Sequence, residues 1–125
     1  MTPALSEITQ IAVVVSDVSV SLPYYRDVLG LPFLFSPRPE LALLQAGSVR
    51  IMLTLSFGHG TAGANSAVLY FKVDDIEATQ AAIVARGGIE ERGPVLTAKM
   101  PDHELWIGIL KDPDGNLIGL IEEKR

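Results

Sequence analysis

The chain has 125 residues, 48% of them hydrophobic and 20% charged, which is the composition of one compact globular domain rather than of a disordered segment. Its 15 acidic and 10 basic residues give a net charge of −5, and no cluster of Lys and Arg is present that could bind nucleic-acid phosphates. The longest unbroken apolar runs, among them Ile11–Val15 and Ala81–Ala85, have five residues each, whereas a membrane span needs roughly 20.

The sequence contains no cysteine and two histidines, His59 and His103. The lack of cysteine excludes disulfides, thiol nucleophiles and thiolate metal sites. A metal site would therefore have to combine the histidines with carboxylates. Residues 1–7 have neither a basic start nor a long apolar stretch, so they do not resemble a secretory signal, and we expect a cytoplasmic protein.

The first half of the chain opens with an alternating, β-branched segment that predicts a strand. A helix is expected after it over residues 18–29, with Asp17 or Ser19 as its N-cap and Gly30 at its end. Pro23 lies inside this helix, and because proline is tolerated only in the first turn, the helix is expected to start late or to kink there. The strands predicted in this half are residues 8–15, 32–36, 41–46 and 49–55.

The second half follows a glycine-rich segment, residues 56–66, that is typical of a linker. After one strand, Asp74 and Glu77 match a capping box, which predicts the start of a second helix. Gly87 and Gly88 mark the end of that helix. The strands predicted in this half are residues 67–73, 90–96, 104–111 and 117–122, with a turn over 111–116 between the last two.

The two halves are similar to each other. Residues 11–18 align with residues 69–76, and in each half the strand is followed by an acidic helix start, a helix and a glycine. The predicted order is therefore β-α-β-β-β, twice. We interpret the chain as one domain, 1–125, built from a module at about 8–55, a linker at about 56–66 and a module at about 67–123.

Four segments, by their order and spacing, resemble the vicinal oxygen chelate superfamily, which includes glyoxalase I, epimerases, extradiol dioxygenases, fosfomycin-resistance enzymes and bleomycin-binding proteins. The ending, Leu120–Lys124, is similar to that of bacterial glyoxalase I. The resemblance covers roughly residues 8–123. It implies an α+β fold in which two βαβββ modules form a cup-shaped mixed sheet with helices outside. The segments are Val15–Asp17, Tyr24–Leu31, Val73–Ile76 and Asp112–Ile118.

Members of this family typically hold a divalent metal in the cup with four side chains, usually His or Gln, Glu, His and Glu. By the resemblance, these positions fall on Gln10, Met52, Val68 and Gly119. Gln10 alone offers a ligand suited to a hard or borderline cation. A single neutral amide cannot hold a catalytic divalent ion, which normally needs three or four protein ligands. We therefore expect no cofactor here, with a divalent metal held by unusual ligands as the alternative.

Strand alternation sorts the remaining side chains by face. A mixed face, apolar with a few polar groups, is typical of a small-molecule site, although these polar residues could equally lie solvated near strand ends. We expect Gly119 to make the cup roomier. Trp106 is either a core residue or a stacking wall for a planar ligand. The candidate ligand-binding residues are Gln10, Arg50, Met52, Thr54, Val68, Tyr70, Trp106 and Gly119.

The two histidines also have two interpretations each. His59, between two glycines, is either an exposed linker residue or part of a lid over a ligand. His103, beside Glu104, is either a solvated loop residue or a general base.

Two functions from different classes remain open. The first is a metal-free binding module, similar to the bleomycin-binding branch of the family, that holds a small, partly hydrophobic molecule. The net charge of −5 favours a cationic ligand through long-range attraction. The alternative is a metal-dependent lyase, isomerase or dioxygenase with unusual ligands such as Gln10, His59, His103 or Glu104. In either case we expect a homodimer, because two small modules bury little surface alone.

Overall fold

The computed structural model describes residues 3–56, 60–64 and 67–125. Its elements follow the order β-α-β-β-β twice, which confirms the predicted α+β fold of two βαβββ modules. The first half contains β1 (Gln10–Val14), α1 (Val18–Pro23), η1 (Tyr24–Val28), β2 (Phe33–Arg38), β3 (Leu41–Ala46) and β4 (Val49–Thr54). The second half contains β5 (Leu69–Lys72), α2 (Ile76–Ala85), β6 (Ile89–Lys99), β7 (Glu104–Lys111) and β8 (Leu117–Lys124).

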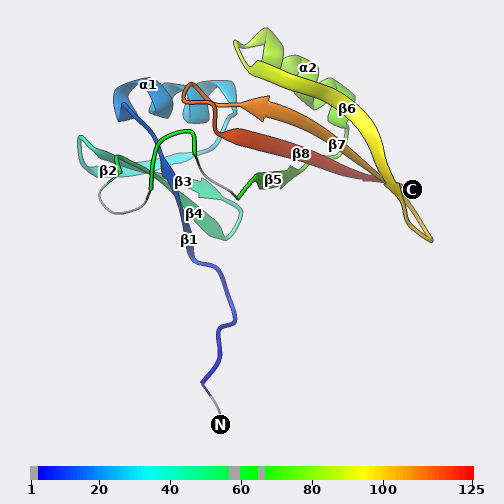
Figure 1. Cartoon of the computed structure of the whole chain (residues 1–125), viewed down its shortest axis with the longest axis horizontal. Coiled ribbons are helices and arrows are strands. Elements are labelled where there is room, and N and C mark those ends of the chain that lie inside the picture. The colour runs from blue at the N-terminus through cyan, green and yellow to red at the C-terminus, as the bar shows by residue number, and fades with distance from the viewer. Residues whose placement is uncertain (1–2, 57–59, 65–66) are drawn as a thin grey trace.

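Each half forms a four-stranded mixed sheet of the same topology. The strand orders are β1-β4-β3-β2 and β5-β8-β7-β6, so β1 and β5 are both edge strands. In each sheet the edge strand pairs in parallel with the last strand of its half, and the other pairings are antiparallel. Both helices lie on the same side of the two sheets (Figure 1). Among the described residues, no helix combines the length and apolar content that a membrane crossing requires.

The first helix starts where the sequence predicts, but Pro23 changes how it continues. Asp17 is extended and its carboxylate accepts from the Ser19 backbone N–H at 2.9 Å, so Asp17 is the N-cap. After Pro23 the chain widens into a π turn, in which the Leu29 N–H donates to the Tyr24 carbonyl at 2.9 Å. Proline has no N–H to continue an α-helical ladder, and a π turn is one way to absorb that loss.

The second helix begins one residue later than the capping-box prediction. Asp75, not Asp74, is the N-cap, and its carboxylate accepts from the Ala78 N–H at 3.1 Å. Glu77 does not complete the box, because its carboxylate accepts from the Lys124 ammonium at 2.8 Å. The predicted glycine stop is confirmed: Gly87 has φ of 105°, a left-handed conformation that glycine adopts without strain.

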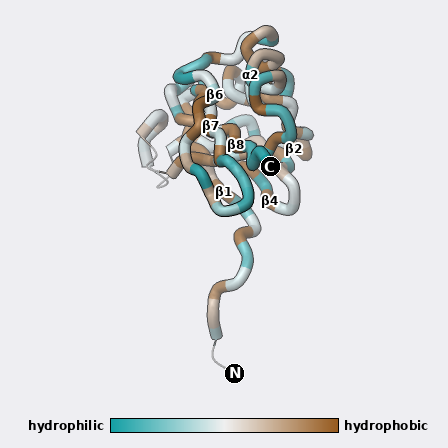
Figure 2. The backbone as a smooth tube through the Cα atoms, turned by 90° about the vertical axis from the view of Figure 1, so that its right-hand side faces the viewer, coloured by the Kyte–Doolittle hydropathy of each residue, from teal (hydrophilic) through white to brown (hydrophobic). Residues whose placement is uncertain are grey.

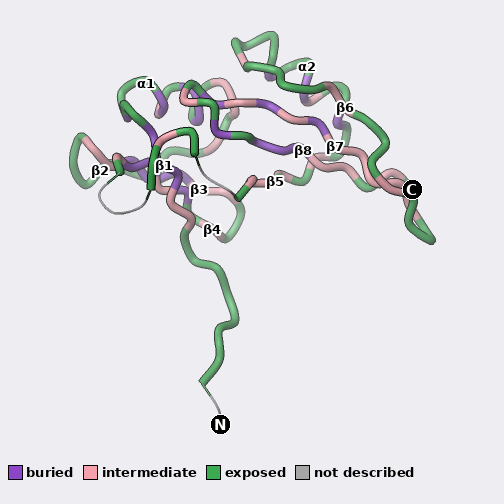
Figure 3. The backbone as a smooth tube through the Cα atoms, in the orientation of Figure 1, coloured by how far each residue is buried: buried purple, intermediate pink, exposed green. Residues whose placement is uncertain are grey.

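The core lies between the helices and the sheets. Odd-numbered residues of β1 and β4 point into it, as the alternation predicts, together with Ala42 and Leu44 of β3, and the buried segments of Figure 3 follow this layer. The hydropathy of the chain agrees with this position of the core. Apolar segments concentrate in the body of the molecule, while residues 3–9 project away from it (Figure 2). Core residues from both halves belong to one cluster that includes Val13, Tyr25, Ile51, Ile76, Leu110, Ile118 and Leu120.

A buried carboxylate joins the two halves. Asp112, in the turn between β7 and β8, is 1% exposed. Its Oδ2 accepts from the Tyr25 hydroxyl and from Asn116 Nδ2, each at 2.8 Å, and its Oδ1 accepts from the backbone N–H groups of Asp114 and Asn116 at 2.9 Å. Asn116 Nδ2 also donates to the Val14 carbonyl of β1 at 3.1 Å. Burial and the Asp112 charge raise the pKa of the Tyr25 hydroxyl, which therefore stays protonated as a donor.

Replacing Tyr25 with phenylalanine should weaken this junction. Tyr25→Phe removes one donor to a buried carboxylate, so we expect the free energy of unfolding to fall by about 1.5–3 kcal/mol in urea denaturation. Asp27→Asn breaks an exposed pair with Arg26 in the same turn and should leave the free energy of unfolding nearly unchanged, because solvent screens such a pair. Equal losses in the two variants would show that the Tyr25–Asp112 bond is not a principal tie between the halves.

Candidate functional site

The first half of the predicted site lies on β1 and β4. These strands pair with Gln10 opposite Arg50 and Ala12 opposite Met52. Gln10 Nε2 lies 3.5 Å from Met52 Sδ, to which it donates, so two of the predicted positions are in direct contact. Gln10 is exposed and Met52 is half-buried. Both lie on the face of the sheet that carries no helix.

The second half of the site lies on β5 and β8, where Tyr70 is in register with Gly119. A Cβ atom added at Gly119 would lie 2.3 Å from Tyr70 Cδ1, far inside van der Waals contact. The Tyr70 ring therefore lies directly on the glycine, while the residue remains 50% exposed. The expectation that Gly119 makes the cup roomier is wrong, because the tyrosine ring fills that space.

The other predicted residues occupy different environments. Arg50 is exposed and Val68 is half-buried just before β5. Thr54 is 0% exposed, and its hydroxyl donates to the Leu55 carbonyl at 2.9 Å, so it does not face a ligand from where it lies. Trp106 is in register with Glu122 on the helix-bearing face of the second sheet, where it packs against the core. The structure thus separates Trp106 from Tyr70 and Gly119.

The histidines lie apart from these positions. His59 is outside the described residues. His103, whose side chain is 13% exposed, contacts Asp102 with Nδ1 at 2.7 Å and Glu123 with Nε2 at 3.8 Å. Hydrogen bonds from His103 and then from Arg125 hold the pKa of the Asp102 carboxyl below its usual range. This cluster ties the β6–β7 hairpin to the C-terminal end of β8.

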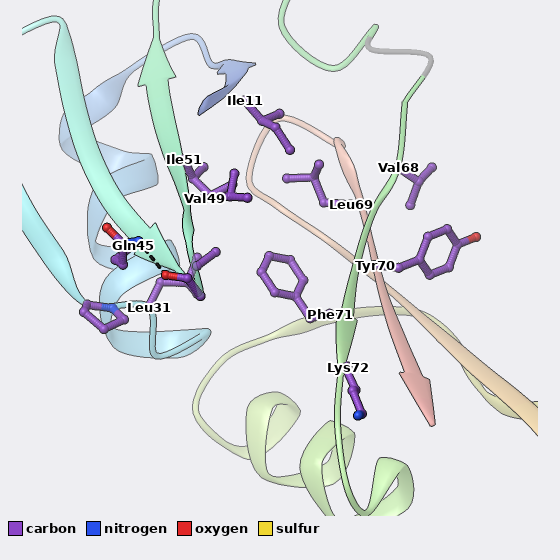
Figure 4. Close-up of a pocket in the computed structure, with 13 residues that line it drawn as sticks. Ile11, Leu31, Gln45, Val49, Ile51, Val68, Leu69, Tyr70, Phe71 and Lys72 are labelled. Carbon is purple, nitrogen blue, oxygen red and sulfur yellow. Dashed lines mark hydrogen bonds between the residues drawn. The ribbon is translucent and has the colours of Figure 1, made fainter. Parts of the chain in front are cut away.

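A groove of about 630 Å³ separates the two sheets (Figure 4). Ile11, Val49 and Ile51 from the first sheet point toward Leu69 and Phe71 of β5, whereas the Tyr70 side chain points away. Gln10, Met52 and Gly119 do not line this groove, whereas Val68 and Tyr70 are among its lining residues. The two halves of the predicted site therefore lie on separate sheet faces, and the apolar groove between the edge strands β1 and β5 borders the second half.

The residues at the four metal positions do not fit a divalent ion. An amide, a thioether and two side chains without donor atoms offer no anionic ligand, and the Tyr70 ring occupies the space at Gly119. Among the described residues, a group of Asp75, Glu77 and Glu122 has carboxylate oxygens within 4.8 Å of one another. Asp75 and Glu77 belong to the start of α2, where Glu122 of β8 accepts from the Ile76 N–H and Glu77 accepts from Lys124.

The paired modules, the shared helix-side core and the two open sheet faces define the architecture of a cup-forming βαβββ protein. Residues 7–120 match the model of the Glyoxalase/Bleomycin resistance protein/Dioxygenase superfamily, and the chain belongs to this family. It is 36% identical over 126 residues to a lactoylglutathione lyase of Haemophilus influenzae, a match that covers 88% of this chain and 87% of the relative.

Two solved structures show the same fold. TnmS3, an antibiotic binding protein from Streptomyces sp. CB03234, superposes with a TM-score of 0.76 at 25% identity, over 98% of this chain and 100% of the other. A lactoylglutathione lyase from Agrobacterium tumefaciens gives a TM-score of 0.72 at 20% identity, over 96% of each chain. At that identity the lyase shows the fold alone.

The contact between Tyr70 and Gly119 can be tested by a double-mutant cycle. We expect Gly119→Ala to lower the free energy of unfolding by about 1–3 kcal/mol, because the new methyl group must displace the ring. In a Tyr70→Ala background the same change should be neutral or stabilising, since alanine suits a strand better than glycine does. Additive effects in urea denaturation would show that the ring does not lie on Gly119.

Proposed function

We propose that this protein binds a small, partly hydrophobic molecule on its open sheet faces, without a divalent metal. The observation that carries the proposal is the Tyr70 ring on Gly119, where the family's usual carboxylate is replaced by an aromatic surface. The antibiotic-binding relative supports a binding role for this architecture.

The open faces supply apolar surface beside the predicted polar groups. On the first sheet, Met52 is in register with Leu43, and Leu43 with Phe35. On the second, Gly119 is in register with Ile109. An apolar ligand group buried against them would contribute about 25 cal/mol per Å² before the cost of association.

A second copy of the chain is the expected partner. The groove between β1 and β5 is lined mostly by apolar side chains, and each of these edge strands has one side of its backbone without a strand partner among the described residues. Exposed edges and apolar grooves are usually covered in native proteins. A dimer that covers the groove would also bring sheet faces of the two copies together. The two halves of the binding site could then come from different copies of the chain.

A metal-dependent enzyme is the second candidate, favoured by the 36% identity to a lactoylglutathione lyase. It would need unusual ligands, and the structure places the candidates apart. Gln10 contacts Met52 on the first sheet, whereas His103 and Glu104 line a pocket with Lys99, Met100, Lys124 and Arg125 on the second. This separation favours the binding function.

A neutral apolar dye tests the binding site directly. We expect N-phenyl-1-naphthylamine to bind saturably, in a fluorescence titration that EDTA does not change, and Tyr70→Ala to weaken its binding about tenfold by removing the ring surface. Leu96→Ala is the matched control, because Leu96 is similarly exposed but is in register with Trp106 on the opposite face. One equivalent of zinc, nickel, iron or manganese in the untagged protein would contradict the metal-free site.

The dimer has its own test. Light scattering at micromolar concentration should give twice the 13.4 kDa of one chain. Val49→Lys places a charge in the groove and should raise the dimer dissociation constant at least tenfold, whereas Val20→Lys, on the exposed side of α1, should leave it unchanged. A wild-type monomer under these conditions would refute the dimer.

A further inference from the structure

The open faces carry positive charge although the chain is acidic. Arg50 projects from the first sheet, in register with Gln10. On the second sheet, one row across the strands runs from Tyr70 through Gly119 and Ile109 to Arg92. Lys72 follows Tyr70 by two residues on β5 and therefore lies on the same face. The sequence predicts that Arg92 lies in a strand, residues 90–96. It does not predict this row across the sheet, because the register of β6 depends on the neighbouring strand and not on the local pattern.

These three cations have no ion-pair partner within the described residues, and all three are exposed. On the second sheet, Lys111 of the same face is paired with Glu91 at 2.7 Å, and Lys124 of the helix-bearing face is paired with Glu77 at 2.8 Å. Arg50, Lys72 and Arg92 therefore remain available as charges on the two faces that carry no helix.

The acidic residues are placed elsewhere or are already engaged. Among the strand residues that the register assigns to these faces, Glu123 is acidic, and the Glu91 carboxylate reaches the same face, where it is paired with Lys111. Its carboxylate lies 3.6 Å from Arg125 Nη2 and 3.8 Å from His103 Nε2. The net charge of −5 therefore comes from other surfaces. A bound molecule responds most strongly to the nearest charges, because screening in salt removes interactions beyond about 8 Å.

We propose that the ligand of this protein is an anionic aromatic molecule, with Tyr70 as the surface for its ring and Arg50, Lys72 and Arg92 as the residues that select its negative charge. The proposal rests on the proposed binding function and names the chemical class of its ligand. It reverses the expectation of a cationic ligand drawn from net charge, because the local field on the binding faces has the opposite sign.

Two dyes that differ in one sulfonate separate charge selection from apolar binding. The probes are 8-anilinonaphthalene-1-sulfonate and the neutral N-phenyl-1-naphthylamine, each titrated by fluorescence into the intact protein. We expect the sulfonate to bind at least tenfold more tightly than the neutral dye, and this preference to shrink when salt is raised from 50 to 500 mM.

Single substitutions assign the preference to residues. Arg50→Gln, Lys72→Gln and Arg92→Gln should each weaken sulfonate binding about threefold or more, and the triple variant should lose the preference, while binding of the neutral dye changes less than twofold. Lys99→Gln is the matched control: Lys99 is exposed on the same sheet but is in register with Glu104 on the helix-bearing side. All substituted side chains are exposed, and far-UV circular dichroism verifies the fold.

The outcomes distinguish the selection of negative charge from the proposed binding function. Equal binding of the two dyes by the wild type, or a preference that survives in the triple variant, would overturn the charge assignment while leaving a Tyr70-dependent site for the neutral dye intact. If neither dye binds saturably, the proposed binding function fails together with the anionic ligand class.

Discussion

The Asp112 carboxylate is the contact on which the arrangement of the two halves depends. It is buried and is balanced by four hydrogen-bond donors rather than by a cation. A buried charge is stable only when its lone pairs are satisfied. Three donors belong to its own turn, and the Tyr25 hydroxyl comes from the other half of the chain. The turn and the first module therefore stabilise each other, and one core forms under both helices.

This junction decides which surfaces remain open. Because the helix-side faces of both sheets are used in the shared core, no helix covers the opposite faces within the described part of the chain (Figure 1). The same geometry leaves β1 and β5 as unpaired edges with an apolar groove between them. The positions that hold the metal in the family here carry an amide, a thioether, a valine and a glycine, and the Tyr70 ring lies on the glycine. The proposed binding role follows from this combination of retained scaffold and changed side chains.

The sequence predicts the order of elements and the inward face of the strands, because β-branched alternation, an acidic cap and glycine stops are local signals. Local patterns do not predict contacts that depend on the register between strands or on which of two neighbouring residues takes the same role. Asp74 and Asp75 are both able to cap α2, and the backbone conformation at Asp75 decides between them. Trp106 lies on the core side because of its pairing with Glu122. The Tyr70 ring on Gly119 joins residues far apart in the chain, so no single-sequence signal reports it.

The contact between Tyr70 and Gly119 also constrains how this protein could change over generations. A carboxylate at position 119 would have to enter space that the ring already fills, since even its Cβ atom would lie 2.3 Å from the ring. The ring would have to be displaced or replaced in the same step. Under the proposed binding function, loss of the tyrosine alone would remove the aromatic surface without supplying a metal ligand. The two positions are therefore expected to change together rather than one at a time.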